Sequence, residues 1–179
     1  MSLNEIENFN WEIARLTDET EIGIFDCGDG DLNSFLTEDA KNYLADLFAV
    51  TYLIQANTEI SAYFSLSNDR ITRFDMDKSE WNKMSRNIAN NKRKKSYPAV
   101  KLGRLAVEQK SAQSGFGRLI LYYIKKTYAN SLQNAGCRFI TVDAYAGVTD
   151  FYEKNGFKFM TKEDTDKPTR TMYFDLKSI

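Results

Sequence analysis

The chain of 179 residues contains no histidine, and it has only two cysteines and two prolines. Without histidine there is no imidazole base, no Ser-His or Cys-His nucleophile pair and no HExxH zinc site. The two cysteines, Cys27 and Cys137, stand too far apart in the sequence to form a zinc cluster, so no metal site is expected. Direct attack of an amine on a thioester survives these exclusions, because it needs neither a metal nor a covalent enzyme intermediate.

Long apolar segments are also absent. The longest uncharged apolar stretch covers residues 47–54 and is too short to cross a membrane, and no secretory signal opens the chain. Two cysteines in a chain of this size are typical of small buried residues in a reducing compartment. We therefore expect a cytoplasmic protein with no membrane contact, and the length predicts one domain over residues 1–179.

A glycine loop at the start of a helix is the most informative feature of the chain. Residues 102–107, Leu-Gly-Arg-Leu-Ala-Val, form a strand-like run, and residues 113–118, Gln-Ser-Gly-Phe-Gly-Arg, lead into a long amphipathic pattern. Glycines let the backbone approach a ligand, and the first N–H groups of a helix attract an anion. The segment predicts a phosphate site, although a tight strand-to-helix turn would have the same glycines.

Two well-known phosphate loops do not fit this segment. A Walker loop needs Gly-Lys followed by a hydroxyl residue, and the chain has no such string. The dinucleotide fingerprint needs a third glycine three residues after the second, where this chain has Ile120. A phosphate at this loop would therefore be held in a different way.

Two later segments complete a recognisable pattern. Residues 138–144 alternate like a strand, and residues 151–157, Phe-Tyr-Glu-Lys-Asn-Gly-Phe, read as a short helix capped by Gly156. With the glycine loop, these segments resemble the GCN5-related N-acetyltransferases (GNAT) over roughly residues 98–176. The resemblance implies acetyl-coenzyme A (acetyl-CoA) as the donor, with Tyr152 facing its thioester sulfur, its pyrophosphate on the loop and its pantetheine arm along the preceding strand. The residues that it assigns to the donor are Leu105, Ala106, Val107, Ala112, Gln113, Ser114, Gly115, Phe116, Gly117 and Arg118.

The chain departs from the family pattern at one position of the loop. The family loop usually begins with Gln or Arg, and this chain has Ala112 there. A side-chain contact to the pyrophosphate is therefore missing, or it is supplied by Gln113, Lys110 or Arg118. The backbone N–H groups remain, so the departure affects the affinity for the donor more than the identity of the site.

The N-terminal part of the chain makes the resemblance more specific. Residues 25–36 follow the pattern F-x-C-G-x-x-x-L-x-x-F-L, and Asp31 is predicted to cap the helix that begins there. Together with residues 102–107, this pattern resembles the acetyltransferase toxins of bacterial toxin–antitoxin pairs, over about residues 11–176. Members of that branch acetylate the amino acid carried on tRNA. The resemblance therefore implies aminoacyl-tRNA and a small antitoxin protein as partners.

Tyr152 is the catalytic candidate. A tyrosine with a pKa of about 10 stays protonated at neutral pH and can donate its proton to a departing thiolate. The alternative is that Tyr152 is only an aromatic residue of the core. The base stays open between Glu108, another carboxylate and a water chain. A free α-amine has a pKa of about 8, against about 10.4 for lysine, and a neighbouring ester lowers it further. A site without histidine therefore suits an aminoacyl ester better than a lysine side chain.

A run of basic residues precedes the glycine loop. Residues 82–107 contain eight Lys and Arg and no Asp or Glu, and because the whole chain has a net charge of −1, the remainder carries −9. A basic segment on an otherwise acidic chain suits contact with a polyanion such as tRNA, although a solvated loop would have the same composition. The nucleic-acid-binding candidates are Lys92, Arg93, Lys94 and Lys95.

These observations predict a single α/β domain with a GNAT-like fold, in which a mixed, mostly antiparallel sheet is flanked by helices. Strands are expected near residues 11–16, 48–55, 59–67, 99–107, 138–144, 157–160 and 170–176. The predicted function is acetyl-CoA-dependent acetylation of the α-amine of aminoacyl-tRNA. Transfer to a protein N-terminus or a small amine, and a non-catalytic CoA-binding or interaction module, stay open. So does the oligomeric state, a homodimer included.

Overall fold

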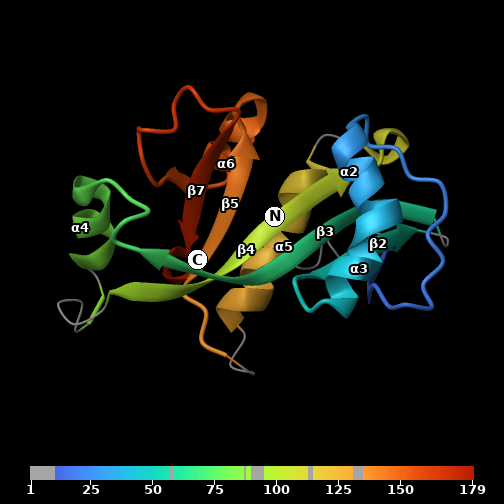
Figure 1. Cartoon of the computed structure of the whole chain (residues 1–179), viewed down its shortest axis with the longest axis horizontal. Coiled ribbons are helices and arrows are strands. Elements are labelled where there is room, and N and C mark those ends of the chain that lie inside the picture. Colours follow the sequence, from blue (N-terminus) through green and yellow to red (C-terminus); the bar gives the residue numbers. More distant parts are fainter. Residues whose placement is uncertain (1–10, 57–58, 87, 90–94, 113–114, 131–134) are drawn as a thin grey trace. The chain divides into compact units, whose positions relative to one another are not determined.

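The computed structural model describes residues 11–56, 59–86, 88–89, 95–112, 115–130 and 135–179. Its strands form one seven-stranded sheet in the order β1-β2-β3-β4-β5-β7-β6 (Figure 1). The strands are β1 (Glu12–Arg15), β2 (Val50–Ala56), β3 (Glu59–Thr72), β4 (Ser96–Val107), β5 (Phe139–Tyr145), β6 (Lys158–Phe159) and β7 (Thr169–Asp175). The pairs β1–β2, β2–β3, β5–β7 and β6–β7 are antiparallel. All the expected strands are found, and β3 runs five residues further than the sequence predicts.

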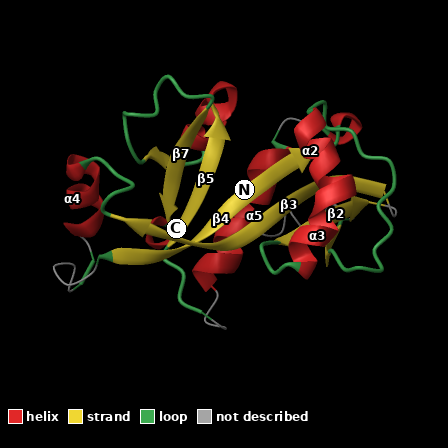
Figure 2. Cartoon of the chain, viewed as in Figure 1, coloured by secondary structure: helices red, strands yellow, loops and turns green. Residues whose placement is uncertain are grey.

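The helices are α2 (Gly30–Ser34), α3 (Ala40–Ala45), α4 (Lys78–Arg86), α5 (Phe116–Asn130) and α6 (Thr149–Lys154) (Figure 2). A π-helical turn, Phe35–Asp39, joins α2 to α3. The apolar spacing of this segment predicts one regular helix, so the wider turn is a difference from expectation. A long loop, residues 160–168, connects β6 with β7 (Figure 2). None of the described helices is long and apolar enough to cross a membrane.

The chain forms two compact units that share β3, β4 and α5. The first unit consists of Met1–Ser67 and Leu102–Tyr122, and the second of Asn68–Lys101 and Tyr123–Ile179. The glycine loop therefore belongs to the first unit and Tyr152 to the second. One domain over residues 1–179 stays a prediction.

The core of the first unit lies around Tyr63 of β3. Its buried members are Leu16, Phe25, Phe35, Leu36, Ala40, Leu53, Ile60, Tyr63 and Ala106. The Tyr63 ring lies 5.4 Å from that of Phe25 and 6.1 Å from that of Phe35, measured between ring centres. Phe25 and Phe35, the aromatic residues of the F-x-C-G-x-x-x-L-x-x-F-L pattern, are therefore core residues.

The cap of the first helix differs from expectation. Asp29, rather than Asp31, precedes the first helical residue, and its side chain accepts a hydrogen bond from the N–H of Leu32 at 3.0 Å. Asp29 and Asp31 stand two residues apart at this point, so the sequence offers two candidate N-caps. The prediction of Asp31 was wrong: the helix begins at Gly30, so Asp31 lies within its first turn and the carboxylate that accepts from the N–H of Leu32 is that of Asp29.

The second unit has its own core, formed by Ile71, Met76, Met84, Tyr97, Ala99, Phe139, Met160 and Tyr173. Residues 139–142 of β5 are aromatic or mostly β-branched and all buried, as expected for a strand covered on both faces.

The two thiols, Cys27 and Cys137, are free and half-buried. Burial raises the pKa of both, which keeps them protonated.

Candidate functional site

The glycine loop opens α5 as the sequence predicts. Gly115 has a φ of +101°, a left-handed conformation that favours glycine, and its carbonyl accepts the first helical hydrogen bond from the N–H of Leu119 at 3.0 Å. A side chain built on Gly115 would meet nothing within 4 Å, so the space beside the loop is open. The N–H groups of residues 116–118 begin the helix and have no intrahelical partner. The helix start can therefore accept an anion.

The side chains around this loop have separate roles. Phe116 is buried, and its ring lies 4.1 Å from that of Trp11, so Phe116 anchors the helix start by packing. Arg118 and Ala112 are both exposed. Gln113 and Ser114 lie outside the described residues.

The three predicted donor-binding residues of β4 differ in how deeply their side chains are buried. Ala106 is buried in the core of the first unit, while Leu105 and Val107 are half-buried. Their alternation follows from the pleat of a strand, which turns successive side chains to opposite faces. Ala106 therefore supports the strand through its side chain, and a ligand along β4 would be met by backbone groups and by the other two residues.

The connection between β4 and α5 is held by the N-terminal segment, which the sequence did not reveal. The N–H of Gln109 donates to the carbonyl oxygen of Asp26 at 2.9 Å, and its side-chain amide lies 3.3 Å from the Asp26 carboxylate. Gly28 fits closely here, because a Cβ atom would lie 2.9 Å from the Gln109 amide nitrogen. The N–H of Gly28, then the Asn33 amide, hold the pKa of Asp26 below its usual value. The F-x-C-G segment thus supports the turn that follows β4.

Glu108, a candidate base, caps the short turn that follows β4. Its carboxylate accepts from the N–H of Ser111 at 3.1 Å and lies 3.8 Å from the ammonium of Lys110. These contacts account for a carboxylate at this position without any catalytic role, and they leave the base unassigned.

Tyr152 lies on α6 in the second unit. Its side chain is 7% exposed, and its ring makes edge contacts with Phe151 and Phe157 at 5.2 and 5.4 Å between ring centres. Burial raises the pKa of Tyr152 to about 12. No group among the described residues forms a hydrogen bond with its hydroxyl. Tyr152 therefore keeps its proton across the physiological pH range, and its hydroxyl can donate a hydrogen bond to a ligand.

The turn after α6 was predicted correctly. Gly156 has a φ of +82°, and its N–H donates to the carbonyl oxygen of Glu153 at 2.8 Å. A Cβ atom on Gly156 would lie 3.1 Å from the ring of Phe174. Glycine is required both by the backbone conformation and by this close approach.

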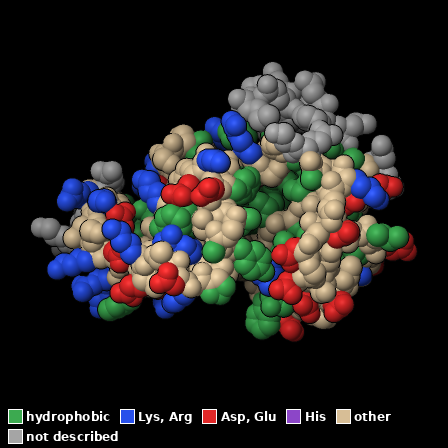
Figure 3. Space-filling model, turned by 90° about the horizontal axis from the view of Figure 1, so that it is seen from above, with side chains coloured by type: hydrophobic (Ala, Val, Ile, Leu, Met, Phe, Trp, Pro, Cys, Tyr) green, Lys and Arg blue, Asp and Glu red, His purple; other side chains and the backbone are tan. Residues whose placement is uncertain are grey.

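The basic run is partly neutralised within the protein. Lys83 pairs with Glu80 (2.6 Å) and Lys101 pairs with Asp143 (2.5 Å), whereas Arg104 lies over the ring of Phe35 (4.9 Å) and keeps its charge. Lys95 is exposed, whereas Lys92, Arg93 and Lys94 lie outside the described residues. Figure 3 shows Lys and Arg side chains gathered at the end of the molecule that carries α4. The charge available to a polyanion is therefore smaller than the sequence suggests.

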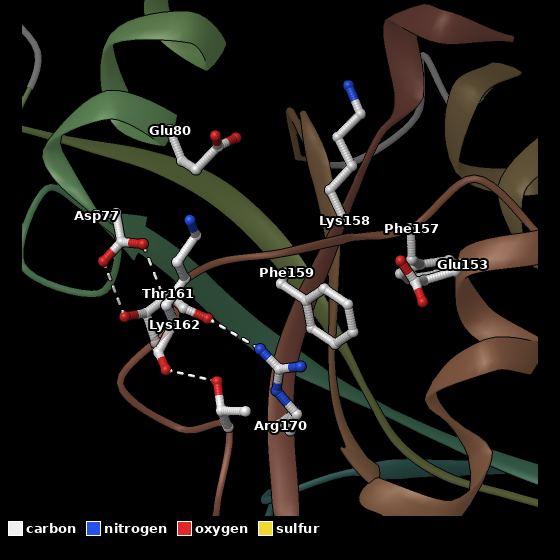
Figure 4. Close-up of a pocket in the computed structure, with 10 residues that line it drawn as sticks. Asp77, Glu80, Glu153, Phe157, Lys158, Phe159, Thr161, Lys162 and Arg170 are labelled. Atoms are coloured by element: carbon white, nitrogen blue, oxygen red, sulfur yellow. Dashed lines mark hydrogen bonds between the residues drawn. The ribbon is translucent and has the colours of Figure 1, made fainter.

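A pocket of about 460 Å³ lies in the second unit, beside α4 and the loop after β6 (Figure 4). Asp77 accepts hydrogen bonds from the hydroxyl of Thr161 and the N–H of Lys162, at 3.0 and 3.2 Å. The guanidinium of Arg170 donates to the Thr161 carbonyl oxygen and lies 3.7 Å from the centre of the Phe159 ring. These charged groups are satisfied by the pocket wall itself, and none of the predicted site residues lines it.

Among the described residues, no group of three or more His, Cys, Asp or Glu side chains could hold a metal ion.

Comparison with known proteins gives structural matches only. No protein-family model and no curated protein sequence matches the chain. The toxin AtaT complexed with acetyl-methionyl-tRNAfMet is 23% identical and has a TM-score of 0.75, with 94% of this chain and 96% of that chain covered. A tyrosine-to-phenylalanine mutant of AtaT, bound to the C-terminus of the antitoxin AtaR and acetyl-CoA, is also 23% identical, with a TM-score of 0.72 and 94% and 95% covered.

A tyrosine-to-phenylalanine mutant of KacT is 22% identical, with a TM-score of 0.74 over 94% of this chain and 96% of that chain. At these identities the likeness concerns the fold. The chain has the fold of these toxins, and the fold class predicted from the sequence is confirmed.

Proposed function

We propose that the protein is an acetyl-CoA-dependent N-acetyltransferase that acetylates the α-amine of aminoacyl-tRNA. The observation that carries the proposal is the glycine loop, with its open space at Gly115 and, at the start of α5, N–H groups that have no partner within the helix. It occurs in a fold shared with AtaT, which has been solved with acetyl-CoA. The donor's phosphates suit this helix start because they are anionic and small enough to meet the backbone.

Tyr152 is proposed to act as the general acid. Acetyl-CoA supplies the acetyl group as a thioester. When the acceptor nitrogen bonds to the acetyl carbon and the carbon–sulfur bond breaks, the proton at the Tyr152 Oη passes to the sulfur, and the nitrogen loses its own proton to solvent or a base. A buried tyrosine with a pKa of about 12 is protonated before each turnover. Its hydroxyl forms no hydrogen bond with the described residues, so it can turn toward the sulfur without breaking one of these contacts.

The acceptor is proposed from two observations. A chain without histidine suits an amine that is already weakly basic, and the α-amine of an aminoacyl ester is such an amine. The basic residues of the run that have no partner among the described residues supply positive charge for the phosphates of tRNA, and the sequence adds Lys92, Arg93 and Lys94 to this charge. AtaT has been solved with acetyl-methionyl-tRNAfMet, which supports this acceptor, and its complex with AtaR supports a small antitoxin as partner.

The deciding experiment offers several acceptors in parallel with labelled acetyl-CoA. Charged tRNA, a peptide with a free N-terminus and spermidine are incubated with the protein, and the label is followed into each. We expect label in charged tRNA. Label in the peptide or in spermidine, with none in tRNA, would favour a different acceptor, and no transfer with intact donor binding would favour a non-catalytic CoA-binding module.

A further inference from the structure

We propose that Lys125 of α5 is a positioning residue that fixes Tyr152 by holding the C-terminal end of α6. The inference rests on the proposed function for the role of Tyr152, but its structural part can be tested without activity. Nothing in the sequence motifs singles out Lys125.

Lys125 is a buried cation. Its side chain is 8% exposed, although it belongs to a surface helix rich in tyrosine and lysine. The ammonium lies 4.0 Å from the centre of the Phe174 ring and 5.1 Å from that of Phe157. Burial lowers the pKa of Lys125 to about 8, so it is mainly charged at neutral pH. A buried charge is unfavourable unless it is paired, and here two aromatic faces and one carbonyl provide that pairing.

The carbonyl that Lys125 holds belongs to the cap of α6. Its ammonium donates a hydrogen bond to the carbonyl oxygen of Asn155, the residue that ends the helix. The last carbonyls of a helix lack partners within it, and the helix dipole makes this end attractive to a cation. Lys125 thus satisfies a carbonyl that the helix itself cannot satisfy.

The same turn is bonded directly to Tyr152. The carbonyl oxygen of Tyr152 accepts from the N–H groups of both Asn155 and Phe157 at 3.0 Å. The Phe157 ring contacts the Tyr152 ring, and the ammonium of Lys125 lies 5.1 Å from the centre of the same Phe157 ring. Displacement of Asn155 or Phe157 would therefore change the direction of the Tyr152 side chain. A misplacement of about 1 Å in a catalytic group can reduce a rate by about 100-fold.

The experiment compares three variants of the intact protein. Lys125→Met keeps the length and apolar stem, Lys125→Arg keeps the cation, and Lys154→Met is the matched control, since Lys154 is exposed on α6. We expect Lys125→Met to lower kcat by about 10- to 100-fold with the KM for acetyl-CoA unchanged. Lys125→Arg should recover most of the loss, and the control should resemble the parent.

A double-mutant cycle separates positioning from general stability. If Lys125 acts through Tyr152, Lys125→Met should cause little further loss of kcat in a Tyr152→Phe background. Equal loss in both backgrounds, or an unchanged kcat in the single variant, would overturn the proposal. A melting experiment on each variant confirms that the protein remains folded.

Amide hydrogen exchange tests the structural part alone. The backbone amides of residues 149–157 should exchange faster in Lys125→Met than in the parent, and they should exchange at the parent's rate in Lys154→Met. Exchange in Lys125→Met at the parent's rate would overturn the proposal, even if the protein transfers no acetyl group. If the parent transfers acetyl to no acceptor while the exchange result holds, the proposed function fails and the anchoring of α6 by Lys125 stands.

Discussion

The hydroxyl of Tyr63 donates a hydrogen bond to the carbonyl oxygen of Leu32, with the two oxygens 2.6 Å apart. Tyr63 lies on β3 and is fully buried, while Leu32 lies on α2, just before the π-helical turn. The bond joins the N-terminal helical segment to the sheet of the first unit. It also accounts for a polar atom in the centre of that core.

Tyr63→Phe should therefore lower the free energy of unfolding by about 1 kcal/mol, because the Leu32 carbonyl loses a donor inside the core. Urea unfolding measures the change. Tyr52→Phe is the control, since Tyr52 is half-buried and its ring stacking on Phe64 at 5.1 Å is kept in the variant. An equal effect at both positions would mean that the Tyr63 bond has no special importance.

Gly117→Asp tests the glycine loop as the donor site. Saturation with acetyl-CoA at 100 times its Kd should stabilise the parent by ~2.7 kcal/mol, and the variant should lose this gain because a carboxylate would stand at the phosphate site. Thermal melts with and without acetyl-CoA measure it. Gly136→Asp, which adds the same charge at an exposed glycine with open space around it, should behave as the parent. A parent whose melting temperature does not respond to the donor would argue against donor binding.

Tyr152→Phe should preserve folding and donor binding and reduce turnover by about 10²- to 10⁴-fold, since the ring remains and the proton is lost. Initial rates with the acceptor found in the parallel assay measure the effect. Tyr145→Phe serves as control, because Tyr145 is 45% exposed at the end of β5. Normal turnover in a folded Tyr152→Phe protein would identify Tyr152 as a packing residue.

The basic run can be tested by replacing Lys92, Arg93, Lys94 and Lys95 with Glu. Binding of tRNA should weaken and become less salt-dependent, because each lost phosphate contact removes about 0.9 from the slope on duplex and about 0.7 on single strands. Donor binding should be unchanged. The control carries Glu at four exposed lysines of the C-terminal part, Lys154, Lys162, Lys167 and Lys177. Transfer to tRNA with an unaltered salt slope would assign the run to a solvated loop.

The buried ammonium of Lys125 predicts a dependence of stability on pH. Its pKa is about 8 in the folded protein and about 10.4 in an unfolded chain, so between these values the unfolded state binds more protons. The contribution of Lys125 to the free energy of unfolding therefore increases as the pH rises from 8 to 10.4. The difference in stability between the parent and Lys125→Met should grow in favour of the parent across this range. Urea unfolding at several pH values measures it, and a difference that stays constant would contradict the buried position.

Much of the candidate site could be predicted from sequence because its signals are local. The left-handed glycines at 115 and 156 are required by the turns in which they stand, and the apolar spacing of α5 follows from its own residues. Tyr152 was found from its place beside such a turn. The roles of these residues in binding and catalysis stay predictions.

Other features depend on residues that are distant in the sequence. The bond between Asp26 and Gln109 joins positions 83 residues apart, and no local pattern announces it. Lys125 had one signal, a charge within the buried side of an amphipathic helix, but its partners at Asn155 and Phe174 come from other elements. The cap at Asp29 was missed because two acidic residues fit the same rule.

The sequence by itself determined the positions of the strands along the chain, the glycine loop and the exclusion of histidine-based chemistry, since backbone preference and residue inventory are local properties. Tertiary structure alone decided that the F-x-C-G segment supports the turn after β4, that Ala106 is buried while Leu105 and Val107 are half-buried, and that a lysine holds the end of α6. The physical reason is that burial and pairing of polar groups depend on which surfaces meet. The same ammonium would be solvated on an isolated helix, and it becomes an anchor only where Phe174 and Asn155 surround it.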